Sequence, residues 1–244
     1  SGIDTYELQR VNGYVKTEFT SIKDAGGTLV KTAIKDYNYD KNGNVTAVRE
    51  YDWVDYGTVP RTNGRPTGTP AGAVVKRVTT NTLAYSTPDA SDSNSNHANS
   101  YWNSTAPSLR NAVAATEVSN GSVTLARTEL TYDNAATTGN LTQQKNWDST
   151  KGAYSNPLTG GNSISVSNQY DGYGNPTLST DARGYQTQFV YGSIGGITDL
   201  YPTQIKTAFQ TAVQRTETRE YDFSTGAVTR TTDVDNNVST ATTY

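Results

Sequence analysis

The sequence predicts an all-β protein, mainly antiparallel, in which β-hairpins follow one another along the chain as a continuous twisted strip. The first observation is a series of Asn-Gly and Gly-Gly dipeptides between alternating segments, at 12–13, 26–27, 42–43 and 120–121. Such dipeptides supply the positive φ angles that tight hairpin turns require. The second is that the arms are rich in valine, threonine and tyrosine, which favour strands. The third is that no segment shows the apolar period of a helix.

The first third of the chain is expected to alternate strands with loops. Residues 6–53 are predicted to form one antiparallel meander, because three of these turns lie within them. A further strand is predicted over 74–85, where β-branched residues are frequent. Residues 57–73 carry three prolines, and residues 86–108 are mostly Ser, Asn, Asp, Ala and Thr. Both of these segments are interpreted as loops or insertions.

The prediction divides the chain into three stretches of one continuous β module. Residues 1–56 hold the N-terminal hairpins and the first of the repeats described next. Residues 57–128 are the insertion and loop-rich stretch, and they enter a hairpin predicted over 112–132, whose turn is Asn120-Gly121. Residues 129–244 hold three further repeats.

Four segments of the chain align on one pattern. In each, Tyr-Asp precedes a turn that contains glycine, and threonine follows that glycine by three residues. The segments are YDKNGNVT from Tyr39, YDNAATTGNLT from Tyr132, YDGYGNPT from Tyr170 and YDFSTGAVT from Tyr221. A second aspartate follows each glycine by seven or nine residues, at Asp52, Asp148, Asp181 and Asp233.

Each member of this pattern has a physical role in a turn. Tyrosine combines a large apolar ring with a hydroxyl that can reach water or a carbonyl, which suits a sheet with partly buried faces. The aspartate can accept backbone N–H bonds from two residues on, and the glycine can take the positive φ that reverses the chain. In the strand YQTQFVY, the residues Tyr185, Thr187, Phe189 and Tyr191 share one face. We therefore expect one packed face and one solvated face there.

The repeated unit resembles the YD repeats of the RHS and teneurin-like families. The resemblance covers 37–53 and 129–244 best and 1–36 more loosely, and GGITDLYPTQI is similar to the Tyr-Pro-Thr insert of some of these proteins. It implies a very long secreted or surface-anchored bacterial chain whose repeats wind as one β-strip, sometimes into a hollow shell around a toxin or another cargo. This chain has no Asp-Pro dipeptide like that at the self-cleaving end of RHS cores and no appended toxin domain, so self-cleavage and toxicity are not carried over.

Composition and charge narrow the function classes. Only 33% of the residues are apolar, and 17 Tyr stand against 4 Phe, so the core is expected to be thin, as in a hollow shell. The net charge is -3 and no block of like charges occurs. The charge pattern therefore does not favour binding to nucleic acid or to a membrane surface. No apolar run approaches the roughly 18 residues of a membrane-spanning helix. With no methionine and a Ser-Gly start, the chain is expected to be an excised piece or a mature product.

No catalytic, cofactor-binding or metal-binding residue is predicted, and no cofactor. His97 is the only histidine, and it lies in a polar loop without the partners that zinc or a catalytic triad would need. Two alternations of oxygen-bearing residues resemble calcium loops: Asp40, Asn42 and Asn44, and Asp233, Asp235 and Asn237. Neither has the glycine position and the distal glutamate of an EF-hand, so both are interpreted as turns.

The predicted function is that of a non-enzymatic extracellular scaffold segment of a larger YD-repeat protein, with a surface, shell or filament role. Expected partners are neighbouring repeats or other copies, through open sheet edges, and a cargo or surface glycan; neither nucleic acid nor a membrane span is expected. The expected localisation is extracellular or cell-surface. The alternative is a carbohydrate- or cell-surface-binding module with Trp53, Trp102 and Trp147 as its aromatic platform. An enzyme would need a cleft with converging acids of perturbed pKa.

Overall fold

The computed structural model describes residues 13–40, 43–84, 111–133 and 139–242. These residues form strands and one short 3-10 turn, with no α-helix, so the all-β prediction is confirmed. The elements are β1 (Thr17–Lys23), β2 (Leu29–Tyr39), β3 (Val45–Tyr51), β4 (Val54–Asp55), η1 (Tyr56–Thr58), β5 (Arg61–Thr62), β6 (Arg65–Pro66), β7 (Val75–Leu83), β8 (Val113–Ser119), β9 (Thr124–Tyr132), β10 (Leu141–Trp147), β11 (Ser163–Tyr170), β12 (Pro176–Thr180), β13 (Gln186–Tyr191), β14 (Pro202–Thr207), β15 (Arg215–Tyr221), β16 (Val228–Asp233) and β17 (Val238–Ala241).

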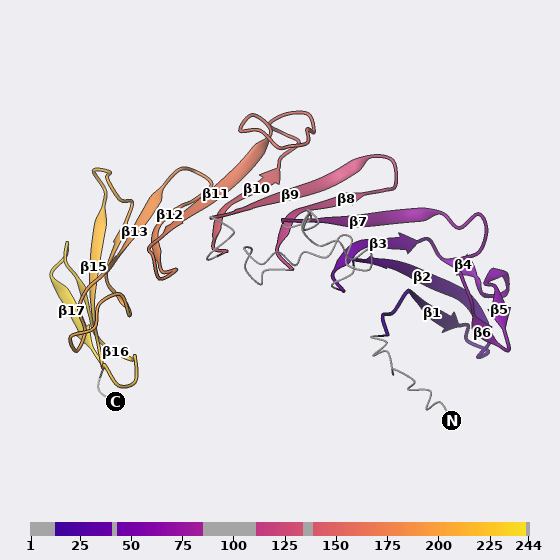
Figure 1. Ribbon diagram of the computed structural model, residues 1–244, viewed down its shortest axis with the longest axis horizontal. Helices are drawn as coiled ribbons and strands as arrows, with labels where there is room; N and C mark the ends of the chain where they lie inside the picture. Colours follow the sequence, from indigo (N-terminus) through magenta and orange to yellow (C-terminus); the bar gives the residue numbers. More distant parts are fainter. Residues whose placement is uncertain (1–12, 41–42, 85–110, 134–138, 243–244) are drawn as a thin grey trace, which may run out of the picture. The chain divides into compact units, whose positions relative to one another are not determined.

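The strands form one long antiparallel sheet whose order follows the chain (Figure 1). It runs β1-β2-β3-β7-β8 and then in sequence to β17, with β4 paired to β2 and with β5-β6 as a separate ribbon. The sheet is open: in the described part of the chain, β1 and β17 stand at its two ends and each pairs on one side. Strand-to-strand connections between consecutive neighbours are what a chain of hairpins produces.

The chain divides into two compact units. The first comprises Ser1–Tyr101 with Glu117–Leu125, and the second comprises Trp102–Thr116 with Ala126–Tyr244. Each unit has a small buried core of its own.

The core of the first unit lies where the segment after β4 covers β2. Thr32 and Ile34 of β2 are fully buried, and Val59, which follows η1, is only 3% exposed. Farther along the same segment, Thr69 Oγ1 donates to Asp36 Oδ2 at 3.0 Å. Val59, in a proline-rich segment that the sequence assigns to a loop, is therefore part of the core of this unit.

That segment also contains a hairpin that the sequence analysis placed in a loop. Asn63 and Gly64 have φ angles of 49° and 75°, and they join Thr62 of β5 to its partner Arg65 of β6. Two consecutive residues of positive φ define a type I′ turn. Pro60 and Pro66 flank the Asn63-Gly64 turn. The segment was therefore interpreted as a loop, because proline is more frequent in loops than in strands.

The predicted Asn120-Gly121 hairpin is present between β8 and β9, but its turn is of another type. Gly121 has a φ of 95°, whereas Asn120 is not in the left-handed region. Instead, Asn120 Oδ1 accepts the N–H groups of Ser122 at 3.0 Å and Val123 at 2.8 Å. The asparagine side chain thus holds a longer loop, as in an Asx-turn. Asn12 and Asn42 lie outside the described residues.

The core of the second unit forms under the loop between β10 and β11. Leu158 of this loop is 2% exposed, and Asn162 and Ser163 are buried beside it. Asn162 Nδ2 donates to Ala153 O at 2.8 Å and to Ser155 Oγ at 2.7 Å. Its Oδ1 accepts the N–H of Thr159 at 2.8 Å, so the buried amide satisfies the loop backbone from within.

A largely buried ion pair holds this loop against β9. Glu129 Oε1 of β9 accepts from Arg127 Nε at 2.8 Å and from the N–H of Leu158 at 3.0 Å. Arg127 also donates through Nη2 to Asn156 Oδ1 at 2.8 Å. The side chains of Arg127 and Glu129 are only 10% and 15% exposed, so their charges depend on each other and on the loop.

Away from these two cores, several strands are half-buried on both faces, whereas β17 is exposed throughout. All residues of β10 and of β13 are intermediate in exposure. The strand predicted at the end of YQTQFVY is confirmed as β13, but the expectation of one packed and one solvated face is wrong. Tyr185, which was assigned to the packed face, is 56% exposed. Where no second layer packs on a sheet, as at β13 among the described elements, neither face can be fully buried.

Candidate functional site

One turn recurs at four places with the same hydrogen bonds. Its sequence is Asp-x-x-Gly-x; the aspartate N–H donates to the carbonyl four residues on, and the glycine N–H donates back to the aspartate carbonyl. In all four, Oδ1 of the aspartate accepts the N–H four residues on, at 2.8–2.9 Å. The aspartates are Asp24, Asp40, Asp171 and Asp181, and the glycines are Gly27, Gly43, Gly174 and Gly184, all of positive φ. The predicted role of aspartate and glycine as turn residues is confirmed.

An asparagine after the glycine completes three of the Tyr-Asp turns. The Nδ2 groups of Asn44, Asn140 and Asn175 donate to Oδ2 of Asp40, Asp133 and Asp171 at 2.8, 2.9 and 3.0 Å. The carboxylate is therefore held through both oxygens. This asparagine was not among the predicted turn residues, although it follows the glycine in three of the four aligned segments.

The fourth Tyr-Asp turn replaces the asparagine by hydroxyls. Ala227 follows its glycine, and Asp222 Oδ1 accepts from Ser224 Oγ at 2.6 Å and from Thr225 Oγ1 and N at 2.8 Å. The Ser224 and Thr225 donors hold the pKa of the Asp222 carboxyl below its ordinary value. The repeat thus keeps the aspartate and changes only the group that binds it.

The repeat tyrosines tie neighbouring strands together. Each stands at the end of its strand, and its hydroxyl donates to a carbonyl at or near the start of the preceding strand. The pairs are Tyr39 to Val15, Tyr132 to Val113, Tyr170 to Leu141 and Tyr221 to Pro202, at 2.9, 3.0, 2.9 and 2.8 Å. This confirms that the hydroxyl of the repeat tyrosine is used for a carbonyl, which phenylalanine could not reach.

A second aromatic residue covers two of the repeat glycines. Tyr14 stacks on Tyr39 with ring centroids 4.9 Å apart, and Tyr201 stacks on Tyr221 at 5.0 Å. The same two rings lie so close to Gly43 and Gly226 that a β-carbon at either glycine would overlap the phenol. Tyr201 opens the Tyr-Pro-Thr segment, so that segment has a packing role in this chain.

The glycine contact predicts unequal effects of two identical substitutions. Gly226 and Gly184 both have positive φ, at 72° and 86°, but a β-carbon meets Tyr201 at Gly226 and nothing within 4 Å at Gly184. Left-handed backbone alone costs alanine about 1 kcal/mol. We expect Gly184→Ala to lower the free energy of unfolding by about that amount and Gly226→Ala by at least about 2 kcal/mol. Urea denaturation measures both, and equal losses would contradict the tyrosine contact.

The second aspartates of the repeats also serve turns. Asp148 Oδ1 accepts from Thr150 N at 2.9 Å and from Thr150 Oγ1 at 2.6 Å, and the threonine hydroxyl lowers the pKa of Asp148. Asp233 Oδ1 accepts the N–H groups of Asp235 and Asn236 at 3.1 Å, and its Oδ2 accepts Asn236 Nδ2 at 2.6 Å. The Asn236 amide is the main reason that the pKa of Asp233 is lowered.

Calcium is expected to leave the stability of this turn unchanged. Both oxygens of Asp233 face amide donors, and Asn237 occupies a left-handed turn position with a φ of 53°. A cation would have to displace those donors before it could bind. Thermal melts with EDTA and with excess calcium should therefore coincide. A rise in melting temperature with calcium, lost in Asp233→Asn, would show that the carboxylate binds the ion.

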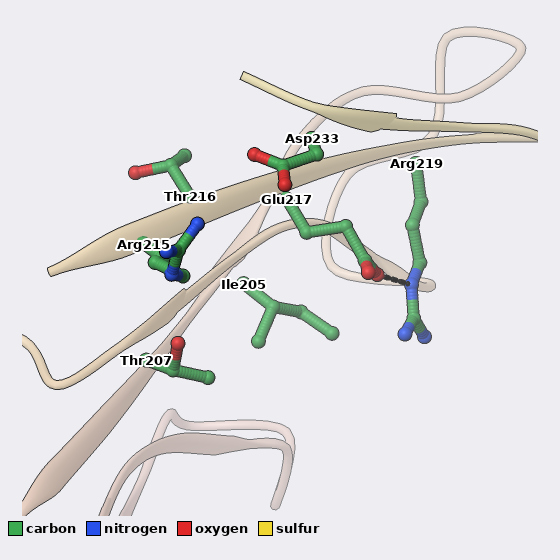
Figure 2. A pocket seen from close by; sticks show the side chains of 7 residues that line it. All are labelled: Ile205, Thr207, Arg215, Thr216, Glu217, Arg219 and Asp233. Atoms are coloured by element: carbon green, nitrogen blue, oxygen red, sulfur yellow. Dashed lines mark hydrogen bonds and ion pairs between the residues drawn. The ribbon is translucent and has the colours of Figure 1, made fainter. Parts of the chain in front are cut away.

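A pocket of about 290 Å³ over β14, β15 and β16 contains two acids (Figure 2). Glu217 stands directly opposite Asp233 in the β15-β16 register, above Ile205 of β14. Glu217 Oε1 is paired with Arg219 Nε at 2.6 Å, and the pKa of Asp233 is lowered by Asn236. A two-carboxylate mechanism needs one protonated and one ionised carboxyl, and the lowered pKa of Asp233 suits only the ionised role.

The two tryptophans that the structure describes have different surroundings. Trp147 is half-buried, packs edge-on against Tyr154 at 5.4 Å, and donates through Nε1 to Gly152 O at 3.2 Å. Trp53 is 48% exposed. Trp102 and His97 lie outside the described residues. Within the ranges that the structure describes, no group of three or more His, Cys, Asp or Glu side chains is arranged to hold a metal ion.

Comparisons with known proteins give likenesses of fold at low identity. No family model matches the chain, and no curated protein matches it. Similar solved structures include the crystal structure of TcdB2-TccC3, with a TM-score of 0.35 and 13% identity over 95% of this chain and 14% of that one. A second is the Photorhabdus luminescens Tc holotoxin pore carrying a TccC3 mutation, with a TM-score of 0.28 and 14% identity over 91% and 9%. A third is a porin-like protein from Bacteroides uniformis ATCC 8492, with a TM-score of 0.30 and 14% identity over 88% and 87%.

This chain therefore spans about a seventh of the length of the first of these proteins and less of the second. In the described ranges, no helix has the length and the apolar character needed to cross a membrane.

Proposed function

We propose that this chain is a non-enzymatic structural segment of a larger YD-repeat protein, with a scaffold role at the cell surface or outside the cell. The observation that supports a structural role is the use of the repeated polar groups. In the Tyr-Asp turns, the tyrosine hydroxyls bind backbone carbonyls and the carboxylates bind turn donors, for example Tyr170 with Leu141 and Asp171 with Asn175. The extracellular placement rests on the resemblance of these repeats to the RHS and teneurin-like families.

The partners proposed for this segment are neighbouring repeats or other copies, bound through the ends of the sheet. All four residues of β17 are exposed, and β17 pairs only with β16 in the described part of the chain. A terminal strand leaves a row of backbone donors and acceptors that another strand can use.

Edge pairing is tested by the association of the purified chain. We expect association that increases with concentration in sedimentation velocity, or else fast amide exchange confined to the terminal strands, with slow exchange at the β8-β9 hairpin. Thr240→Lys places a charge on β17 and should abolish association, while Val213→Lys, in a turn where the side chain is 70% exposed, should not. A strict monomer whose β17 amides are as protected as those of β8 would contradict the scaffold proposal.

The rival function, a glycan-binding platform of tryptophans, has less support. Trp147 uses its ring and its indole N–H within its own loop, so it does not offer a free face comparable to that of Trp53. Sugar stacking needs an exposed aromatic face. A glycan-dependent change in tryptophan fluorescence that disappears in Trp53→Ala would favour this function.

A further inference from the structure

A polar groove of about 490 Å³ lies in the first unit, over β2 and β3, beside the residues that precede β1. The loop at Thr67–Thr69 forms one wall of it. Its volume falls within the range of small-ligand sites, about 300–1,000 Å³. The groove touches Thr17 at the start of the edge strand β1, but its floor lies on β2 and β3, so the ligand proposed for it is separate from the scaffold role proposed above.

The register of the sheet brings the main side chains of the groove onto one face. Asp36 of β2 stands opposite Arg49 of β3. Asn38 lies two residues after Asp36, and Tyr51 lies two residues after Arg49. Since strand residues two apart point to the same side, these four side chains line one floor. Lys16, just before β1, stands at the rim.

The acid of this groove is held by hydroxyl groups. Asp36 Oδ2 accepts Thr69 Oγ1 at 3.0 Å. Burial raises the pKa of the Tyr51 phenol, and so does its hydrogen bond to Asp36. The carboxylate of Asp36 is therefore fixed in place by groups of the loop and the sheet.

The two cations of the groove have no acidic partner in the described residues. Arg49 is half-buried and directly opposite Asp36, yet neither Arg49 nor Lys16 forms an ion pair within the described ranges. Asp36 opposes the partly buried Arg49 guanidinium without forming an ion pair with it in the described residues, so the guanidinium keeps donors for a further acceptor. A bound anion would accept from those donors, and the planar guanidinium matches the two oxygens of a carboxylate as well as those of a phosphate.

The neutral groups around the cations are suited to hydroxyls. Asn38 offers a side-chain amide, Thr67 and Thr69 offer hydroxyls, and the ring of Tyr51 offers an apolar face. From this combination we propose that the groove binds a sugar that carries a carboxylate, such as a uronic acid. Its carboxylate lies against Arg49 and Lys16, its hydroxyls bond to Asn38 and Thr67, and its ring packs on Tyr51.

The pocket of Figure 2 supplies a matched contrast in the same chain. It also holds two arginines, but it holds two acids as well, Glu217 and Asp233, and Arg219 is paired with Glu217. Its charges compensate one another, so a carboxylate ligand has no net attraction there. Arg215 of that pocket is thus the control for Arg49.

The test is a titration of the full chain followed by NMR, with D-glucuronate, D-glucose and acetate as separate probes. We expect glucuronate to bind at least about tenfold more tightly than glucose or acetate, because it alone engages both the cations and the hydroxyl-binding groups. Arg49→Gln should weaken glucuronate binding by about tenfold or more, as loss of a charged hydrogen bond does. Arg215→Gln should leave it unchanged.

A second variant shows whether weaker binding comes from a lost contact or from misfolding. Lys16→Gln alters an exposed side chain before β1, so it should fold normally and still weaken glucuronate binding several-fold. Equal affinity for acetate and glucuronate would show a simple anion site and overturn the sugar assignment. So would equal affinity for glucose and glucuronate, absence of glucuronate binding, or binding that neither Arg49→Gln nor Lys16→Gln weakens.

Discussion

Replacing Leu158 by alanine is expected to lower the free energy of unfolding by about 3 kcal/mol, within the range for a buried leucine. Leu158 is 2% exposed and is the most buried apolar side chain of the second unit. Its backbone N–H also binds the buried Glu129 carboxylate, so loss of the side chain removes apolar contact at the point where the loop is fastened. Urea denaturation followed by circular dichroism measures the loss.

Leu200→Ala is the matched control for this prediction. Leu200 is 40% exposed, so the same chemical change should cost less than about 0.5 kcal/mol. If Leu158→Ala were as mild as Leu200→Ala, the loop between β10 and β11 would not be a core element. The second unit would then derive its stability from the hairpins alone.

Leu158 and Leu200 differ in burial, and this difference could not be predicted from the sequence. Hairpins at Gly27, Gly43, Gly174 and Gly184 could be predicted because their turns are local: aspartate and glycine three residues apart determine the geometry. Leu158 sits in a polar loop with no strand or helix period around it, and its burial depends on strands far away in the sequence. No local pattern carries that information.

The Tyr-Asp turn also combines features that could be predicted from the sequence with features that could not. Tyrosine, aspartate and glycine were recognised because they recur, and their hydrogen bonds match the predicted roles. The asparagine after the glycine also recurs but was overlooked, although its amide binds the second carboxylate oxygen in three turns. The covering of Gly226 by Tyr201 could not be seen, because the two residues belong to different hairpins. The position of Arg49 opposite Asp36 likewise follows from strand register, which could not be predicted from the sequence.

Tyr221→Ala is expected to cost about 3 kcal/mol, at the low end for loss of an aromatic side chain because the ring is half-buried. The substitution removes the stack on Tyr201 and the hydrogen bond to Pro202 O together. Tyr221→Phe keeps the ring and should cost only about 1 kcal/mol, the usual net value of one hydrogen bond. Urea denaturation separates the two contributions.

The same pair of substitutions at Tyr170 tests whether the repeat is an energetic unit as well as a geometric one. Tyr170 makes the equivalent bond to Leu141 O at 2.9 Å, but Asn140 stands beside its turn where Tyr201 stands beside that of Tyr221. Tyr170→Phe should therefore match Tyr221→Phe, and Tyr170→Ala should cost less than Tyr221→Ala by about 0.5–1.5 kcal/mol, the value of an aromatic pair. Losses below about 0.5 kcal/mol for both alanine variants would place these tyrosines on the surface and remove the physical basis of the repeat.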